Sequence, residues 1–210
     1  MPIAPKNPKP WIAFTVAVAL FGIAWTLVEA RFDPRPNSQH PAIVDSAYFA
    51  FALWAGAVLM QAQATAAEWF AGSSAFRVAR AAWLGGLAVF AVHLGLSFHL
   101  AHDWSHARAF DHVEATSGFG PGLFVSYTFA LVWLIDGVAW ARCPEPYARR
   151  PKWIAAILHG AMVFIWINAT VVFGQSPLRW IAAGVFALLL GQLLKNRLLA
   201  RTPLRPLGTE

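Results

Sequence analysis

Residues 11–30 read WIAFTVAVALFGIAWTLVEA, an apolar run in which Glu29 is the one charged residue. A helix of about 20 such residues rises about 30 Å, the thickness of the hydrocarbon core of a membrane. Five further apolar runs of similar length follow along the chain. The sequence therefore predicts an all-α, polytopic transmembrane helix bundle with one domain, residues 11–196. Its six spans are expected at about 11–30, 46–68, 80–102, 122–141, 152–174 and 178–196.

The composition agrees with a chain that lies mostly in lipid. Only 12% of the residues are charged and 58% are hydrophobic, whereas about a quarter of the residues of a soluble domain are charged. The formal net charge is +6, but the basic residues flank apolar runs and form no continuous stripe. We therefore expect the lipid bilayer as the partner, and no nucleic acid. Cys143 is the single cysteine, so no intrachain disulfide can form.

Basic residues gather on one side of the six-span arrangement. Of the 16 Lys and Arg residues, only Arg31, Arg35, Arg108 and Arg179 fall on the other side. Short cytoplasmic loops are enriched in Lys and Arg, so both termini, with tails 1–10 and 197–210, are predicted to be cytoplasmic. The expected location is a bacterial inner membrane. The first apolar run is longer than the core of a cleaved signal, about 7–15 residues, so we expect a retained helix.

Tryptophans near the ends of the predicted spans are typical of aromatic belts at the two membrane interfaces. Those expected at the inner interface are Trp11, Trp69, Trp83, Trp140 and Trp153. Those expected at the outer interface are Trp25, Trp104 and Trp180.

A histidine-rich segment, HLAHDWSHARAFDH at residues 99–112, holds four of the seven histidines. On one continuous helix its first three histidines would share a face, because successive residues are about 100° apart. Imidazole and carboxylate groups are ligands of zinc and of iron. The sequence thus predicts a zinc or iron site at the outer face. Its predicted ligands are His99, His102, His106, Asp103 and Glu114.

Two other interpretations of this segment stay open: histidines that simply meet water and headgroups, and a pH-sensitive gate. The spacing of His102 and His106 resembles the first histidine box of membrane fatty-acid desaturases and hydroxylases. No His-x-x-His-His box occurs elsewhere, so the resemblance assigns no family. A haem between His93 and His159 is not expected, because the two lie at different depths in the predicted spans.

A second polar layer is predicted inside the membrane. Asp136 and His159 fall at a similar depth near the inner face, and a buried carboxyl group must pair or lose its charge. His159 and Gln61 are the expected partners of Asp136. Near the outer end of the fifth span, Asn168 and Thr170 are expected to face the histidine layer.

Three functions compete at this point. The first is a metal-dependent membrane enzyme that uses the histidine segment on a lipid-soluble substrate. The second is a cation or proton transporter or channel that uses Asp136 and His159. The third is a noncatalytic subunit of a larger membrane complex, for which the partners are other membrane proteins or further copies of this chain.

Overall fold

The computed structural model describes residues 9–32, 40–65, 68–174 and 178–201, and this part of the chain is helical and contains no strand. Five of its helices are long and apolar enough to cross a membrane. The prediction of an all-helical integral membrane protein is confirmed to that extent. The predicted tails, apart from the residues of the first and last helices, lie outside the described residues.

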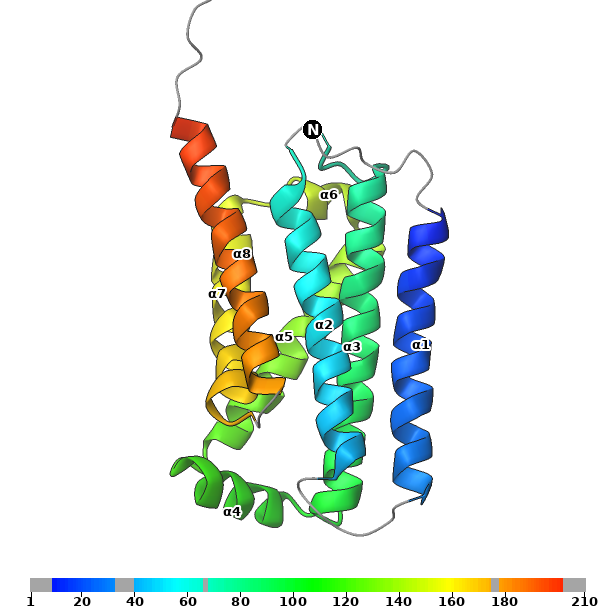
Figure 1. The fold of residues 1–210 in the computed structure, drawn as a ribbon, viewed down its shortest axis with the longest axis vertical. Coiled ribbons are helices and arrows are strands. Elements are labelled where there is room, and N and C mark those ends of the chain that lie inside the picture. Colours follow the sequence, from blue (N-terminus) through cyan, green and yellow to red (C-terminus); the bar gives the residue numbers. More distant parts are fainter. Residues whose placement is uncertain (1–8, 33–39, 66–67, 175–177, 202–210) are drawn as a thin grey trace, which may run out of the picture.

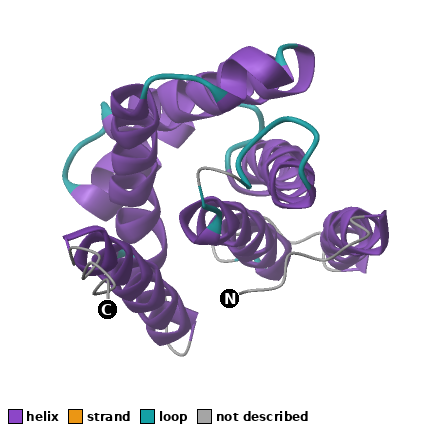
Figure 2. Ribbon diagram, turned by 90° about the horizontal axis from the view of Figure 1, so that it is seen from above, coloured by secondary structure: helices purple, strands orange, loops and turns teal. Residues whose placement is uncertain are grey.

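The long helices run side by side along the bundle (Figure 1). They are α1 (Lys9–Phe32), α2 (Pro41–Gln63), α3 (Ser74–Ala101), α5 (Gly122–Arg142), α7 (Lys152–Ile167) with the π-helix η1 (Asn168–Val172), and α8 (Leu178–Arg201). Two short helices lie at opposite ends of the bundle: α4 (His106–Ser117) and α6 (Pro144–Ala148). Seen from above, helices α1, α2 and α3 pack on one another, and α8 packs on α2 (Figure 2).

Helix α8 is as long as the other long helices but is not among the five that are clearly apolar enough to span a membrane. The sequence of its last turns is polar, with Lys195, Arg197 and Arg201. It starts near the α4 end and finishes at the end of the bundle where α1 begins (Figure 1).

Local capping explains why α2 and α3 begin earlier than hydropathy predicts. Pro41 occupies the first turn of α2, where its missing N–H costs nothing, and Nδ1 of His40 accepts the N–H of Ala42 at 3.1 Å. The hydroxyl of Ser73 accepts the N–H of Phe76 at 3.2 Å and so starts α3. Helix α2 ends at Gln63 instead of residue 68 because Ala64 is extended.

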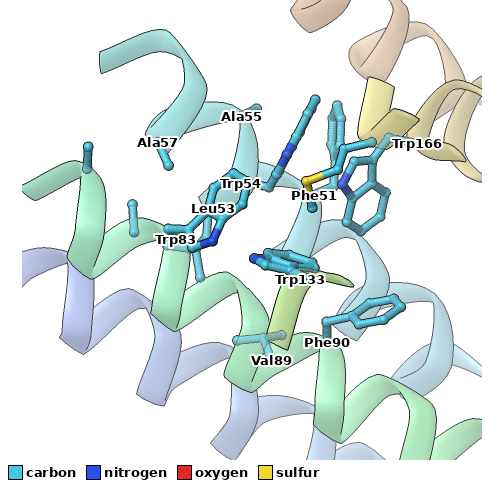
Figure 3. Close-up of a cluster of buried hydrophobic side chains, with 14 of the residues drawn as sticks. Phe51, Leu53, Trp54, Ala55, Ala57, Trp83, Val89, Phe90, Trp133 and Trp166 are labelled. Atoms are coloured by element: carbon cyan, nitrogen blue, oxygen red, sulfur yellow. The ribbon is translucent and has the colours of Figure 1, made fainter. Parts of the chain in front are cut away.

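The core is a cluster of tryptophans from four different helices (Figure 3). Trp133 lies with its ring centre 5.7 Å from that of Trp83 and 6.2 Å from that of Trp166, and Trp166 is 6.1 Å from Trp54. Such aromatic contacts each add about 0.5–1.5 kcal/mol beyond the area that they bury. The cluster ties α2, α3, α5 and α7 together.

The cluster corrects the predicted aromatic belts. Trp83 and Trp140 are fully buried in the core, and their ring centres are 5.9 Å apart. Trp153 and Trp180, in contrast, are exposed on the bundle surface, as a residue facing lipid must be. A position near the end of a span therefore does not by itself make a tryptophan an interface residue.

Candidate functional site

Helix α4 crosses the end of the bundle instead of continuing α3 (Figure 1). The chain turns at Asp103 and Trp104, whose φ angles are +46° and +58°. The hydroxyl of Ser105 then accepts the N–H of Arg108 at 3.3 Å and starts a new helix. The expectation of one continuous helix through the histidine segment is therefore wrong. Residues 99 and 106 lie on two helices with different axes.

Because of this turn, the predicted metal ligands contact different neighbours. His106 Nδ1 lies 2.7 Å from the hydroxyl of Tyr127, and the ring centre of His99 is 6.4 Å from that of Trp104. Asp103 forms an ion pair with Arg108.

The fifth predicted ligand, Glu114, is also engaged. Its Oε2 accepts the N–H of Gly120 at 2.5 Å. Within the described ranges, no three His, Cys, Asp or Glu side chains lie close enough together to hold a metal ion. The five-residue metal site is thus not assembled by this structure.

The structure instead brings together two histidines, one of which was not among the predicted ligands. The ring of His102, at the end of α3, lies 5.3 Å from the ring of His112 on α4. Partial burial of His102 and the positive charge of a protonated His112 lower the pKa of His102 below its ordinary value of 6.5. The His102 ring is consequently held in the neutral form, which is the form that binds a metal or accepts a proton.

His112 also lines a groove of about 530 Å³ between α4, α5 and the end of α7, which we call the α4 groove. This volume lies within the range of pockets for small molecules, about 300–1,000 Å³. Most of the lining is apolar, and the polar residues are His112, Thr116, Ser117, Ser126 and Asn168. The apolar part is formed by Val113, Phe119, Gly122, Val125, Phe164, Ile165, Ala169 and Phe173.

The π-helix η1 forms one wall of the α4 groove. Asn168 begins η1 and lines the groove as expected, with its Nδ2 donating to the carbonyl of Phe164 at 2.7 Å. Thr170 is not among the lining residues; it is buried, and its hydroxyl donates back to the carbonyl of Trp166 at 2.7 Å. Single π-turns are rare in helices and occur frequently at functional sites.

Glycines close the loop between α4 and α5. Gly118 ends α4 with φ +73°, a conformation that favours glycine. At Gly120 a Cβ atom would lie 2.4 Å from a ring carbon of Phe110 and 2.5 Å from Oε2 of Glu114. The close approach lets the backbone of Gly120 reach the Glu114 carboxylate and fixes α4 over the groove.

The residues of the predicted intramembrane layer belong to two separate hydrogen-bonded groups at the other end of the bundle. Asp136 accepts from Arg150 Nη1 at 2.6 Å and from the hydroxyl of Tyr147 at 2.8 Å. His159 Nε2 lies 3.2 Å from Oε1 of Gln61. Asp136 therefore pairs with Arg150 and Tyr147, and not with the partners that we expected for it.

The ion pair of Asp136 is largely buried and further held by Tyr147. The guanidinium of Arg150 lies 3.9 Å from the centre of the Tyr147 ring, which stacks on Trp140 at 4.5 Å. Burial and the neighbouring Asp136 carboxylate raise the pKa of Tyr147 above its ordinary value, so its hydroxyl stays protonated as a donor. These contacts join the loop before α7 to the end of α5.

His93 ties α2 to α3 within the membrane. Its Nδ1 lies 3.0 Å from the carbonyl oxygen of Ile43 and 3.2 Å from the hydroxyl of Ser46. Because a carbonyl oxygen only accepts, Nδ1 carries the proton in that hydrogen bond. The ring centre of His159 lies 5.5 Å from that of Trp83. Trp83 precedes His93 by ten residues on α3. That spacing is about 15 Å along the helix and keeps the two histidines at different depths.

Comparison with protein family models, with curated proteins and with solved structures finds no match to this chain.

Proposed function

We propose that this chain is a six-span membrane protein with both termini in the cytoplasm, and that it binds a lipid-soluble ligand in the α4 groove. The observation that carries the proposal is the lining of the groove, which is apolar except where His112, Asn168 and neighbouring hydroxyls meet it. A molecule with an apolar body and one polar end has this pattern. The start of α1 and the end of α8 lie at the same end of the bundle, which supports an even number of crossings.

The proposed activity is metal-assisted chemistry at the polar end of the ligand, with zinc or iron held by His102 and His112. Two imidazoles on one tetrahedral ion have ring centres about 5 Å apart, and the rings of His102 and His112 are 5.3 Å apart. Catalytic zinc sites commonly have three protein ligands. With two, we expect weak and exchangeable binding, in which water or the ligand completes the coordination.

The ligand is tested with a photoactivatable fatty acid added to the protein in lipid nanodiscs, followed by mass spectrometric mapping of the labelled peptides. We expect labelling of the segments that form the groove, residues 112–126 and 164–173. Val125→Trp fills the groove and is expected to reduce labelling severalfold. Ile135→Trp, which is also on α5 but lines no described pocket, is the matched control. Uniform labelling of all lipid-facing helices would contradict the proposal.

The metal is tested separately, by elemental analysis and by zinc titration of the detergent-purified protein. We expect His112→Ala to abolish zinc binding, whereas His106→Ala, which removes contacts to Tyr127 and Phe98 but none to His102 or His112, leaves it intact. Equal loss in both variants would refute the assignment of the ligands. Labelling of the groove without zinc binding would support a ligand-binding protein that is not a metalloenzyme.

Transport through Asp136 and His159 is supported less well, because each side chain is bonded to a different partner. Proton or cation flux into liposomes that Asp136→Asn abolishes would favour transport over the proposed function. A noncatalytic role would instead give stoichiometric co-purification of membrane partners without zinc binding or groove labelling.

A further inference from the structure

A second pocket, of about 430 Å³, lies at the α6 end of the bundle, opposite the α4 groove. We call it the basic pocket. It is lined by Gln61, Ala64, Thr65, Trp69, Ala148, Arg149, Arg150, Lys152 and Ala155. Three of these nine side chains are cationic and none is acidic. Its lining is thus chemically different from that of the α4 groove.

The charges of Arg149 and Lys152 are not neutralised within the described part of the chain. Arg150 is already paired with Asp136, but Arg149 and Lys152 are exposed and make no ion pair with any described residue. Glu68 neighbours the lining through Thr65, whose N–H and hydroxyl donate to its carboxylate at 3.0 and 2.9 Å. These hydrogen bonds lower the pKa of Glu68, so it is ionised at neutral pH. The lining therefore has two cations without an ion-pair partner among the described residues.

Gln61 lines the basic pocket, and its side-chain amide is only partly hydrogen-bonded. Its Oε1 is engaged with His159, while its buried Nε2 has no partner among the described residues. A buried amide N–H without an acceptor is costly. An oxygen-rich group in the pocket would supply that acceptor.

The wall of the pocket is held in place by the surrounding core. Trp69 packs on Phe76 and on Trp140, with ring centres 5.0 Å and 6.0 Å apart. The buried ion pair to Asp136 holds Arg150, which lies between Arg149 and Lys152 in the sequence. The cations are therefore presented by an ordered loop, which lowers the entropic cost of ligand binding.

We propose that the basic pocket binds a phosphate-bearing anion through Arg149 and Lys152, with the amide of Gln61 donating to a phosphate oxygen. Arg and Lys are the side chains that recognise phosphate oxygens. Basic pockets between transmembrane helices on the cytoplasmic side are a known mode of binding anionic lipid headgroups. The same chemistry fits a phospholipid headgroup or a free phosphate compound, and the experiment separates the two. The inference does not depend on the ligand of the α4 groove.

The test uses the full-length protein in detergent after removal of bound lipid, with thermal unfolding as the readout. Phosphatidylglycerol, phosphatidylcholine and inorganic phosphate are titrated separately. We expect phosphatidylglycerol to stabilise the wild type, and Arg149→Ala and Lys152→Ala each to weaken its apparent affinity about fivefold. Arg142→Ala, an exposed cation at the end of α5 that does not line the pocket, is expected to bind as the wild type does.

Glu68→Gln gives a prediction of the opposite sign. Removal of this neighbouring negative charge is expected to strengthen anion binding by about two- to fivefold. Because a gain of affinity requires a folded protein, this variant keeps the test valid if an alanine variant unfolds. Stabilisation by inorganic phosphate equal to that by phosphatidylglycerol would identify a free phosphate compound as the ligand. No stabilisation by either anion, or equal responses of the Arg149, Lys152 and Arg142 variants, would overturn the proposal.

Discussion

The ion pair between Asp136 and Arg150 gives the sharpest quantitative prediction. The two side chains are 11% and 14% exposed and their charged atoms are 2.6 Å apart. Loss of one partner of a buried pair typically costs about 3–5 kcal/mol, because the remaining charge stays buried without compensation. Asp136 is about 9 Å from the end of α5, and Arg150 borders the basic pocket, so water reaches the pair in part. We therefore expect a cost near the lower limit, about 3 kcal/mol, for Asp136→Asn.

A double-mutant cycle separates the pair from its surroundings. Arg150→Met is also expected to cost about 3 kcal/mol, because it leaves the Asp136 carboxylate without its cation. The double variant buries neither charge, so it should lose no more than either single variant. The resulting coupling is about 3 kcal/mol, or roughly a hundredfold in the unfolding equilibrium constant.

The cycle can be measured by reversible unfolding in mixed detergent micelles, followed by tryptophan fluorescence. Arg142→Met, an exposed cation on the same helix as Asp136, is the control and is expected to cost less than about 0.5 kcal/mol. If the two single effects add within about 0.5 kcal/mol, the pair has no energetic coupling and the reasoning is refuted.

Three further outcomes are expected from the described geometry. Trp133→Ala removes a fully buried ring and should destabilise the protein by about 3–5 kcal/mol in the same unfolding assay, whereas Trp180→Ala, at a side chain 69% exposed, should cost less than about 1 kcal/mol. Gly120→Ala should speed amide hydrogen exchange in α4, because its Cβ would meet a ring carbon at 2.4 Å, while Gly95→Ala, with no atom within 4 Å, should not. Because the pKa of His102 is lowered on folding, the unfolded state takes up its proton first, and the protection factors of the α4 amides, which are corrected for the intrinsic exchange rate at each pH, should fall as the pH falls below 6.5.

Each of these outcomes can fail in a recognisable way. Equal destabilisation by the two tryptophan variants would mean that the core is not centred on Trp133. Unchanged exchange in the Gly120 variant would show that α4 is not fixed by this close approach. A pH effect that persists when His102 is replaced by Gln would have to be assigned to another group.

The positions of the long helices follow from the sequence because hydropathy is a local property. Each run of about 20 apolar residues predicts a helix at that position, whatever its neighbours are. The predicted ends of the helices are less accurate than their positions, because helix ends depend on single capping residues such as Ser73 before α3. The break before α4 also had a local signal, since Ser105 is a good N-cap and follows an Asp-Trp pair that does not continue the apolar pattern.

The buried face of each helix could not be predicted in this way. The spans are apolar around most of their circumference, so the pattern that reveals an inward face in soluble helices is weak. Trp83 and Trp140 therefore resembled interface residues although they are central to the core. Hydropathy gives the depth of a residue in the membrane and not its direction around the helix.

The partners within the sites depend on contacts between distant residues. Asp136 finds Arg150 across a loop and a short helix, and His159 contacts Gln61, which is 98 positions away in the chain. His112 had a weak signal, because it belongs to the histidine segment, but the assumption of one continuous helix placed it away from His102. A turn of two residues is sufficient to separate the predicted ligands on α3 from those on α4.

The π-helix at residues 168–172 has a consequence for the tolerance of this chain to deletion. A π-turn accommodates one more residue than an α-turn, so the residues that follow it lie about 100° from the positions that a continued α7 would give them. Deletion of one residue within η1 would let the backbone return to regular α-helical hydrogen bonds, and the two changes cancel, so Phe173 and Gly174 would keep their present directions. A shorter chain would thus have the more regular helix without a change in the faces that its residues present.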